Sequence, residues 1–168
     1  MPYDLTISDD VTINSDRSFG NLRFKNNSRM VIETGLNSDR RIMVNSLSGK
    51  GSIEVRGGGR LLLYVNQSAV LPGEIIAPEA SSVFIFLRDR DTTLSLKGGN
   101  TSFQGYIYGP DARVDLSGTQ NFTGAIIAGI VYSKGNVGIT YENIPAIPGI
   151  GVGGGSTVHN FTQQYWVE

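Results

Sequence analysis

The sequence predicts an all-β protein, a single-domain β-solenoid (parallel β-helix) with about 20 residues per coil and a C-terminal strap. Three observations support this prediction. Helical periodicity is nearly absent, and short apolar alternations closed by Gly, Asn, Asp or Ser recur along the chain. The segment FQGYIYG at 103–109 is repeated as FTGAIIA at 122–128. Self-similarity at about twenty residues indicates stacked turns that bury a shared core.

The expected strands follow one another closely, with turn-forming residues between them. They are shorter and closer together than the strands of a β-sandwich, which favours stacked solenoid turns. In the first half of the chain we expect strands at 4–7, 11–13, 21–24, 29–33, 41–44, 52–55 and 60–65. In the second half we expect them at 73–76, 82–87, 93–96, 105–108, 113–116, 124–127, 130–132, 137–141 and 163–167.

Apolar residues spaced by about one turn are predicted to stack inside the solenoid. Gly105 and Gly124 fall where a turn must bend sharply, and glycine tolerates the backbone angles that such corners need. The Phe two residues before each glycine can stack on its counterpart one turn away. The expected ladders are Leu22, Ile42 and Leu62; Leu94 and Val114; Leu96 and Leu116; Phe103 and Phe122; and Ile107 and Ile126.

The pattern divides the chain into three parts. Residues 1–142 are the predicted solenoid, and 143–156 form a Gly/Pro-rich loop. Residues 157–168 regain a strand pattern. Because the end of a solenoid exposes an open edge that must be covered or charged, we expect this strand to pack back on the solenoid through Trp166.

Composition narrows the classes of function. The chain has 168 residues, a net charge of −1 and no cysteine. Because the net charge is close to zero, the chain has no overall positive field that would attract nucleic acid. Because it has no cysteine, it can form neither disulfides nor metal sites with thiolate ligands. No apolar run approaches the roughly 20 residues of a membrane helix.

Candidate catalytic groups are few. His159 is the only histidine, so it cannot provide a metal cluster or a Ser-His-Asp set. Asp111 with Asp115, and Asp89 with Asp91, lie beside turns, where Asp is normally favoured. We therefore expect no catalytic residue, metal ligand or cofactor. A carbohydrate-binding or carbohydrate-active β-helix stays open as the alternative, because two carboxylates converging on a groove would make a glycosidase site.

Exposed aromatic and basic residues are the better candidates for a site. Tyr106 and Tyr108 alternate around Ile107, and Tyr132 and Tyr141 follow one or two turns further on. Arg88 and Arg90 form the turn RDRD with two aspartates. Stacked tyrosines on an outer face suit contact with carbohydrate or protein. DNA contact would need a local basic cluster. Its candidates are Arg40, Arg41, Arg56, Arg60, Arg88 and Arg90, with Asp39, Glu54 and Asp89 as expected neutralising neighbours.

Four segments carry a resemblance to a known family. They are FQGYIYGP (103–110), VDLSG (114–118), FTGAIIA (122–128) and GNVGITYE (135–142). In this order they resemble the C-terminal domain of minor pilin-like type IV pilus assembly proteins, with residues 60–142 carrying most of the match. The motif residues are Phe103, Gly105, Pro110, Phe122, Gly124, Gly135, Asn136 and Tyr141. Gly109 departs from the family pattern, which has Ala there.

The resemblance implies a non-catalytic β-solenoid displayed on a pilus or bacterial cell surface. Its expected roles are pilus assembly, adhesion, or contact with DNA or a surface. It implies other pilin subunits as partners, reached through an N-terminal helix that this sequence lacks, and no membrane contact by residues 1–168. Surface glycan, protein and DNA remain open as further partners. The natural protein is expected to be extracellular and membrane-anchored ahead of residue 1.

Overall fold

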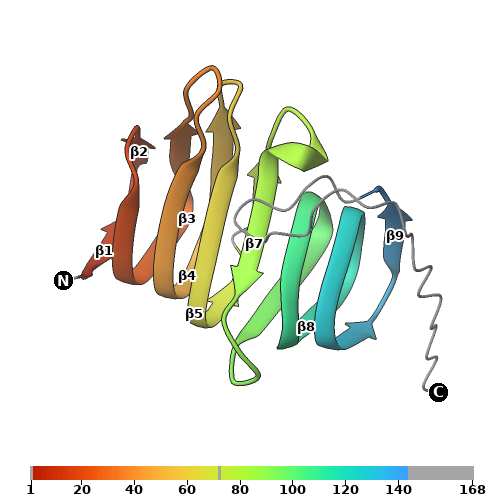
Figure 1. The fold of residues 1–168 in the computed structure, drawn as a ribbon. Helices are drawn as coiled ribbons and strands as arrows, with labels where there is room; N and C mark the ends of the chain where they lie inside the picture. Colours follow the sequence, from red (N-terminus) through yellow and green to blue (C-terminus); the bar gives the residue numbers. More distant parts are fainter. Residues whose placement is uncertain (1, 72, 144–168) are drawn as a thin grey trace.

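The chain folds into a stack of β-strand turns, the β-solenoid that the sequence predicts (Figure 1). The computed structural model describes residues 2–71 and 73–143. Each turn takes roughly 22 residues, close to the expected twenty. The strands are β1 (Tyr3–Ile7), β2 (Asp10–Ile13), β3 (Arg17–Glu33), β4 (Arg40–Arg56), β5 (Leu61–Val70), β6 (Glu74–Ile76), β7 (Val83–Leu87), β8 (Thr93–Lys134) and β9 (Val137–Tyr141), with the short 3-10 helix η1 (Ala80–Ser82) before β7.

Three ladders of parallel pairs run along the stack, and we name the corresponding faces A, B and C. Face A pairs residues 40–44 with 61–65, then 83–87, and then 106–108. Face B pairs residues 46–47 with 68–69 and then 93–94. Face C pairs residues 10–13 with 29–32, 52–55 and, in part, 74–76. Each turn therefore passes through faces A, B and C in order.

The core is a column of apolar side chains inside these ladders. On face B, Leu5 pairs with Leu22, Leu22 with Leu47, Leu47 with Ala69, and Ala69 with Leu94, through five successive turns. Alternation along each strand sends every second side chain inward, so this column collects one or two residues per strand.

The ladder predicted for the first half of the chain was wrong. Leu22 pairs with Leu47, while Ile42 pairs with Leu63. Leu62 lies in a cluster separate from the main core. The turn between Leu22 and Leu47 spans 25 residues, because a loop at 34–39 lengthens it, so a fixed spacing of twenty shifts the register.

The second half follows the prediction. The rings of Phe103 and Phe122 stack with centroids 5.2 Å apart and an interplanar angle of 17°. Gly105 and Gly124 have φ values of +150° and +139°, and a side chain at Gly124 would overlap the carbonyl oxygen of Gly105. Glycine is therefore required where the adjacent turns approach most closely.

The sequence predicted many separate short strands, whereas β3, β4 and β8 continue around corners. Strand β8 alone runs from Thr93 to Lys134 and includes five expected strands. The corners bend at single residues such as Gly118 without losing the ladder bonds, so no long turn interrupts the strand.

Several expectations lie outside the described residues. They are the loop at 143–156 beyond its first residue, the strand at 163–167, His159, and the packing of residues 157–168 through Trp166. Within the part of the chain that the structure describes, no helix is long and apolar enough to cross a membrane.

Candidate contact surface

An aromatic stripe lies on the outer side of face A. In β7, Val83, Ile85 and Leu87 point into the main core, so Phe84 and Phe86 point outward. The pairings Phe84 with Tyr106 and Phe86 with Tyr108 continue the stripe into β8, and Tyr64 precedes Phe86. We call Tyr64, Phe84, Phe86, Tyr106 and Tyr108 the outer aromatic stripe.

The rings of the stripe pack on one another across turns. Tyr64 stacks on Phe86 with centroids 4.9 Å apart, and Phe84 lies 5.2 Å from Tyr106. Phe86 and Tyr108 meet edge to face at 6.5 Å. Such pairs add about 0.5–1.5 kcal/mol each beyond the burial of their area. The stripe is therefore a second small core on the outside of the solenoid.

Neighbouring segments cover part of this stripe. Ala80 of η1 belongs to the same cluster, and the Arg60 guanidinium lies over the Phe84 ring at 5.8 Å from its centroid. The Tyr106 hydroxyl donates a hydrogen bond to the Asn143 carbonyl oxygen at 2.9 Å. Burial, with a smaller effect from the nearby Glu142, raises the pKa of Tyr106. Of the predicted contact residues, Tyr106 is thus buried, while Tyr108 is half-buried.

Exposed apolar side chains gather at the last turn. They are Ile130 (56% exposed), Val131 (47%), Tyr132 (49%), Ile139 (57%) and Tyr141 (63%), and we call them the open end. Strand β9 pairs with residues 120–124 of β8 and, among the described residues, is the last strand in the order of the sheet. An edge of this kind offers unpaired backbone groups to another chain. The Arg113 guanidinium covers one side of Tyr132, at 5.5 Å from the ring centroid.

Arg88 and Arg90 lie in the exposed turn between β7 and β8. Asp89 builds this turn, since its carboxylate accepts hydrogen bonds from the Asp91 backbone N–H at 3.1 Å and the Thr92 hydroxyl at 3.2 Å. Arg88 faces Asp89 at 3.6 Å. The structure thus brings the two arginines together in one turn, and it gives Asp89 a structural role there.

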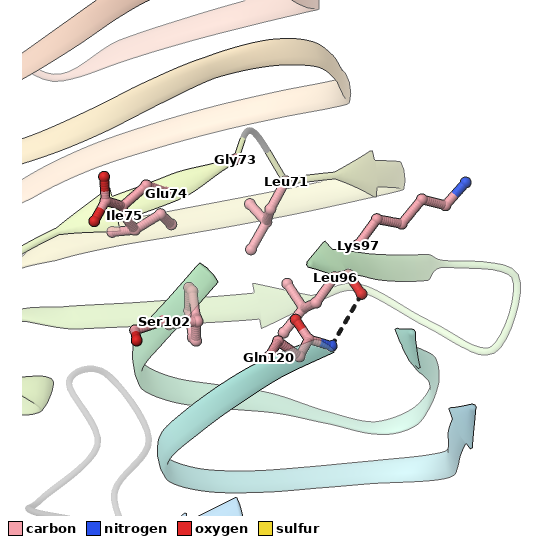
Figure 2. A pocket seen from close by; sticks show the side chains of 9 residues that line it. Leu71, Gly73, Glu74, Ile75, Leu96, Lys97, Ser102 and Gln120 are labelled. Carbon is pink, nitrogen blue, oxygen red and sulfur yellow. Dashed lines mark hydrogen bonds between the residues drawn. The ribbon is translucent and has the colours of Figure 1, made fainter. Parts of the chain in front are cut away.

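Among the described acidic groups, Asp39 and Glu79 line one hollow together with Arg60, which bonds both carboxylate oxygens of Asp39. Asp115 is occupied by an ion pair with Arg113 at 2.7 Å. Among the described residues, no three His, Cys, Asp or Glu side chains are placed to hold a metal ion. The hollow between β6 and β8 has a cavity volume of about 10 Å³, about enough for one water molecule. Figure 2 shows that Gln120 closes this hollow by donating to the Leu96 carbonyl oxygen, at 3.1 Å.

The arginines proposed for DNA contact are mostly neutralised, as the sequence predicted. Arg60 forms a bidentate pair with Asp39, at 3.0 and 2.8 Å, and Arg56 pairs with Glu54 at 2.6 Å. Hydrogen bonds from Arg60 hold the pKa of Asp39 below its usual value. Arg40 faces Asp16 at 4.0 Å rather than the adjacent Asp39. These pairs leave no dense cluster of free arginines on faces A and C in the described chain.

The remaining motif residues act in the scaffold. The Asn136 carbonyl oxygen accepts a hydrogen bond from the Gln120 backbone N–H at 3.2 Å, and Gly135 (φ +108°) stacks on Gly118. Pro110 is exposed and follows shortly after the end of the aromatic stripe. Tyr141 pairs with Gly124 and is the one motif residue that also belongs to the open end.

Sequence reasoning missed Tyr64, Phe84 and Phe86, and it missed the apolar residues of the open end apart from Tyr132 and Tyr141. A signal was present for the phenylalanines. The run VFIFL at 83–87 has no polar residue, which is typical of a strand buried on both sides. No comparable signal marks the open end, because a short apolar run such as IVY at 130–132 is equally typical of a strand that a further turn covers.

The chain was also compared with known proteins. The family model described as Domain of unknown function (DUF7305) matches residues 4–145. No curated protein and no solved structure matches the chain at a significant level.

Proposed function

The chain belongs to the family described as Domain of unknown function (DUF7305), and we propose that it is a non-catalytic contact domain displayed on a type IV pilus-associated, minor pilin-like protein. The observation that carries the contact function is the open end. Its five apolar side chains are each 47–63% exposed and lie together on the last turn. A group of exposed large apolar side chains is typical of a site that another molecule covers.

The two ends of the solenoid differ, which supports a specific role for the last turn. At the first turn, Tyr3 is the large exposed apolar residue, and the first sixteen residues hold four aspartates and no lysine or arginine. Charge at a strand edge opposes association with other chains. The first edge is therefore protected, while the last edge is apolar and suited to contact.

The rigid body behind the open end suits display. Parallel ladders and a continuous core hold the turns in fixed register, so the last turn can be presented without rearrangement of the domain. The placement in a pilus-associated protein rests on the motif resemblance at 103–142. In this proposal, a pilin-type helix ahead of the domain joins it to other pilin subunits, and the domain itself is extracellular.

The decisive experiment changes the open end without changing the core. Ile139→Ser combined with Tyr141→Ser removes two exposed apolar groups, and Tyr3→Ser combined with Leu36→Ser is the matched control, since Leu36 is 87% exposed. Each pair replaces the natural copy in the cells that produce the chain, and surface pili and attachment are measured. We expect the open-end pair to reduce both and the control pair to leave them unchanged. Equal results for the two pairs would refute the proposal.

The outer aromatic stripe favours carbohydrate binding as the second candidate function. Tyr64 and Tyr108 are half-exposed, and stacked rings suit the apolar faces of sugars. Calorimetry with neutral polysaccharides tests this function. A heat of binding that is lost when Tyr64→Ala is combined with Tyr108→Ala would support carbohydrate binding by the stripe. Release of reducing sugars by the purified domain would instead indicate a carbohydrate-active enzyme and refute the non-catalytic proposal.

A further inference from the structure

All four lysines of the chain lie at one corner of the solenoid, the corner between faces B and C. Lys25, Lys50, Lys97 and Lys134 each follow a face B strand segment and precede the turn toward face C. All four are exposed. We call them the lysine row. The ten arginines, in contrast, are distributed over all three faces and the loops.

The pairings fix the spacing of the row along the stack. Phe24 pairs with Gly49, which places Lys25 and Lys50 on adjacent turns. Residue 47 pairs with 69 and residue 69 with 94, so one turn lies between Lys50 and Lys97. Residue 118 stacks on 98 and residue 135 on 118, so one turn likewise lies between Lys97 and Lys134. At about 4.8 Å per turn, the row holds a cation every 5–10 Å over a length of roughly 24 Å.

Within the described residues, the lysine row forms no ion pair, unlike six of the ten arginines. On face C, Arg29 lies between Asp10 of the preceding turn and Glu54 of the following turn, at 2.5 and 3.2 Å. Stacked like charges repel one another. A compensating anion from outside would relieve this repulsion.

A groove follows the same corner. One hollow is lined by Arg23, Lys25 and Lys50, and a second by Lys50 and Lys97. Asn26, Gly49 and Lys50 line both, so the two hollows are continuous. Gly49 (φ +113°) is required at this corner, because a side chain there would overlap the backbone of Phe24 on the adjacent turn. Figure 2 shows the Lys97 ammonium group pointing away from the core, on the outside of this corner.

We propose that this groove binds a linear anionic polysaccharide that carries carboxylate groups, with Lys25, Lys50 and Lys97 of the lysine row pairing the carboxylates. The proposal is independent of the proposed function, because the groove is separate from the open end and the outer aromatic stripe. Asn26, Asn27 and Ser52 line the groove and suit hydrogen bonds to sugar hydroxyls. Glu74, the acidic group in the lining, limits the positive charge.

Nucleic acid fits the groove less well. Duplex DNA presents one negative charge per about 1.7 Å of its axis, a density far above that of the row. Single strands are held by aromatic rings on which bases stack. The one aromatic residue among the described lining of the two hollows is Phe24, which is 2% exposed and therefore closed to a base.

The test measures binding of the full chain to alginate, a linear polyuronate, by calorimetry at low and at moderate salt. Lys50→Gln combined with Lys97→Gln removes two charges from the row. Arg17→Gln combined with Arg41→Gln is the control, because both arginines are exposed and lie on face A. This pair of substitutions changes the net charge by the same amount as the lysine pair. Neutral dextran and a 20-base-pair DNA duplex are the comparison ligands.

We expect the lysine pair to weaken alginate binding by about two- to thirtyfold, because two exposed charge pairs with the ligand are lost. The control pair should bind like the wild type, and added salt should weaken binding in both. Equal weakening by the two pairs, or no binding of alginate, would overturn the site. Equal or tighter binding of the duplex would overturn the class of ligand. Glu74→Gln, which removes the acidic group of the lining, should strengthen binding.

Discussion

Gly124→Ala should strongly destabilise the fold, although it adds a single methyl group. The backbone of Gly124 has φ +139°, a region that L-residues with a side chain rarely adopt, and this costs about 1–3 kcal/mol. The added methyl group would also overlap the carbonyl oxygen of Gly105 on the adjacent turn. Because that oxygen belongs to a laddered strand, relieving the overlap requires a backbone shift that costs a further 1–3 kcal/mol or so. The total of about 2–6 kcal/mol is large beside a typical stability of about 5–15 kcal/mol.

Gly99→Ala is the matched control, because Gly99 is exposed and has no atom within 4 Å of the position that the new methyl group would take. Thermal unfolding followed by circular dichroism compares the two variants with the wild type. For a chain of 168 residues, each kcal/mol lowers Tm by about 2–4 °C. We therefore expect Tm to fall by about 4–24 °C for Gly124→Ala and to change little for Gly99→Ala. Equal Tm values for the two variants would refute the argument that close approach of the turns requires glycine.

Three further predictions concern side chains. Phe122→Ala should lower the free energy of unfolding, measured in urea, by about 3–5 kcal/mol, because Phe122 is 1% exposed and stacks on Phe103. Tyr141→Ala, at an exposed position, should lower it little. Similar losses for the two variants would contradict the assignment of Phe122 to the core. Tyr106→Phe removes the hydrogen bond to Asn143 and should lower the free energy of unfolding by about 0.5–1.5 kcal/mol. An unchanged free energy of unfolding would show that this hydrogen bond contributes nothing. Arg60 lowers the pKa of Asp39 in the folded state, so Asp39 stabilises the fold above its usual pKa of 3.8, and this contribution is lost as pH falls through the lower folded value. Asp39→Asn should therefore reduce stability at neutral pH and converge on the wild type in acid, whereas a pH-independent difference would exclude the linkage.

The fold class and the register of the second half could both be predicted from the order of the residues. Phe103 with Phe122 and Gly105 with Gly124 recur at one turn, because stacked corners impose the same backbone and packing requirements on each turn. The same periodicity failed for the early ladder that began at Leu22, since loops of unequal length separate the first turns. The local pattern shows which residues alternate along a strand, but the lengths of the loops decide which residues of the adjacent turn they pair with.

The surfaces available for contact, in contrast, depend on how the turns stack in space. Tyr106 and Tyr108 were predicted for the outer face, yet burial separates them: Tyr106 is covered and bonded to Asn143, while Tyr108 stays half-exposed. The lysine row was invisible in the sequence, because unequal gaps of 25, 47 and 37 residues separate its four members. Stacking converts those gaps into one line, since each turn returns to the same corner whatever its length. The exposure of the open end likewise follows from the stacking, because Ile139 and Tyr141 lie on β9, the last strand in the order of the sheet among the described residues.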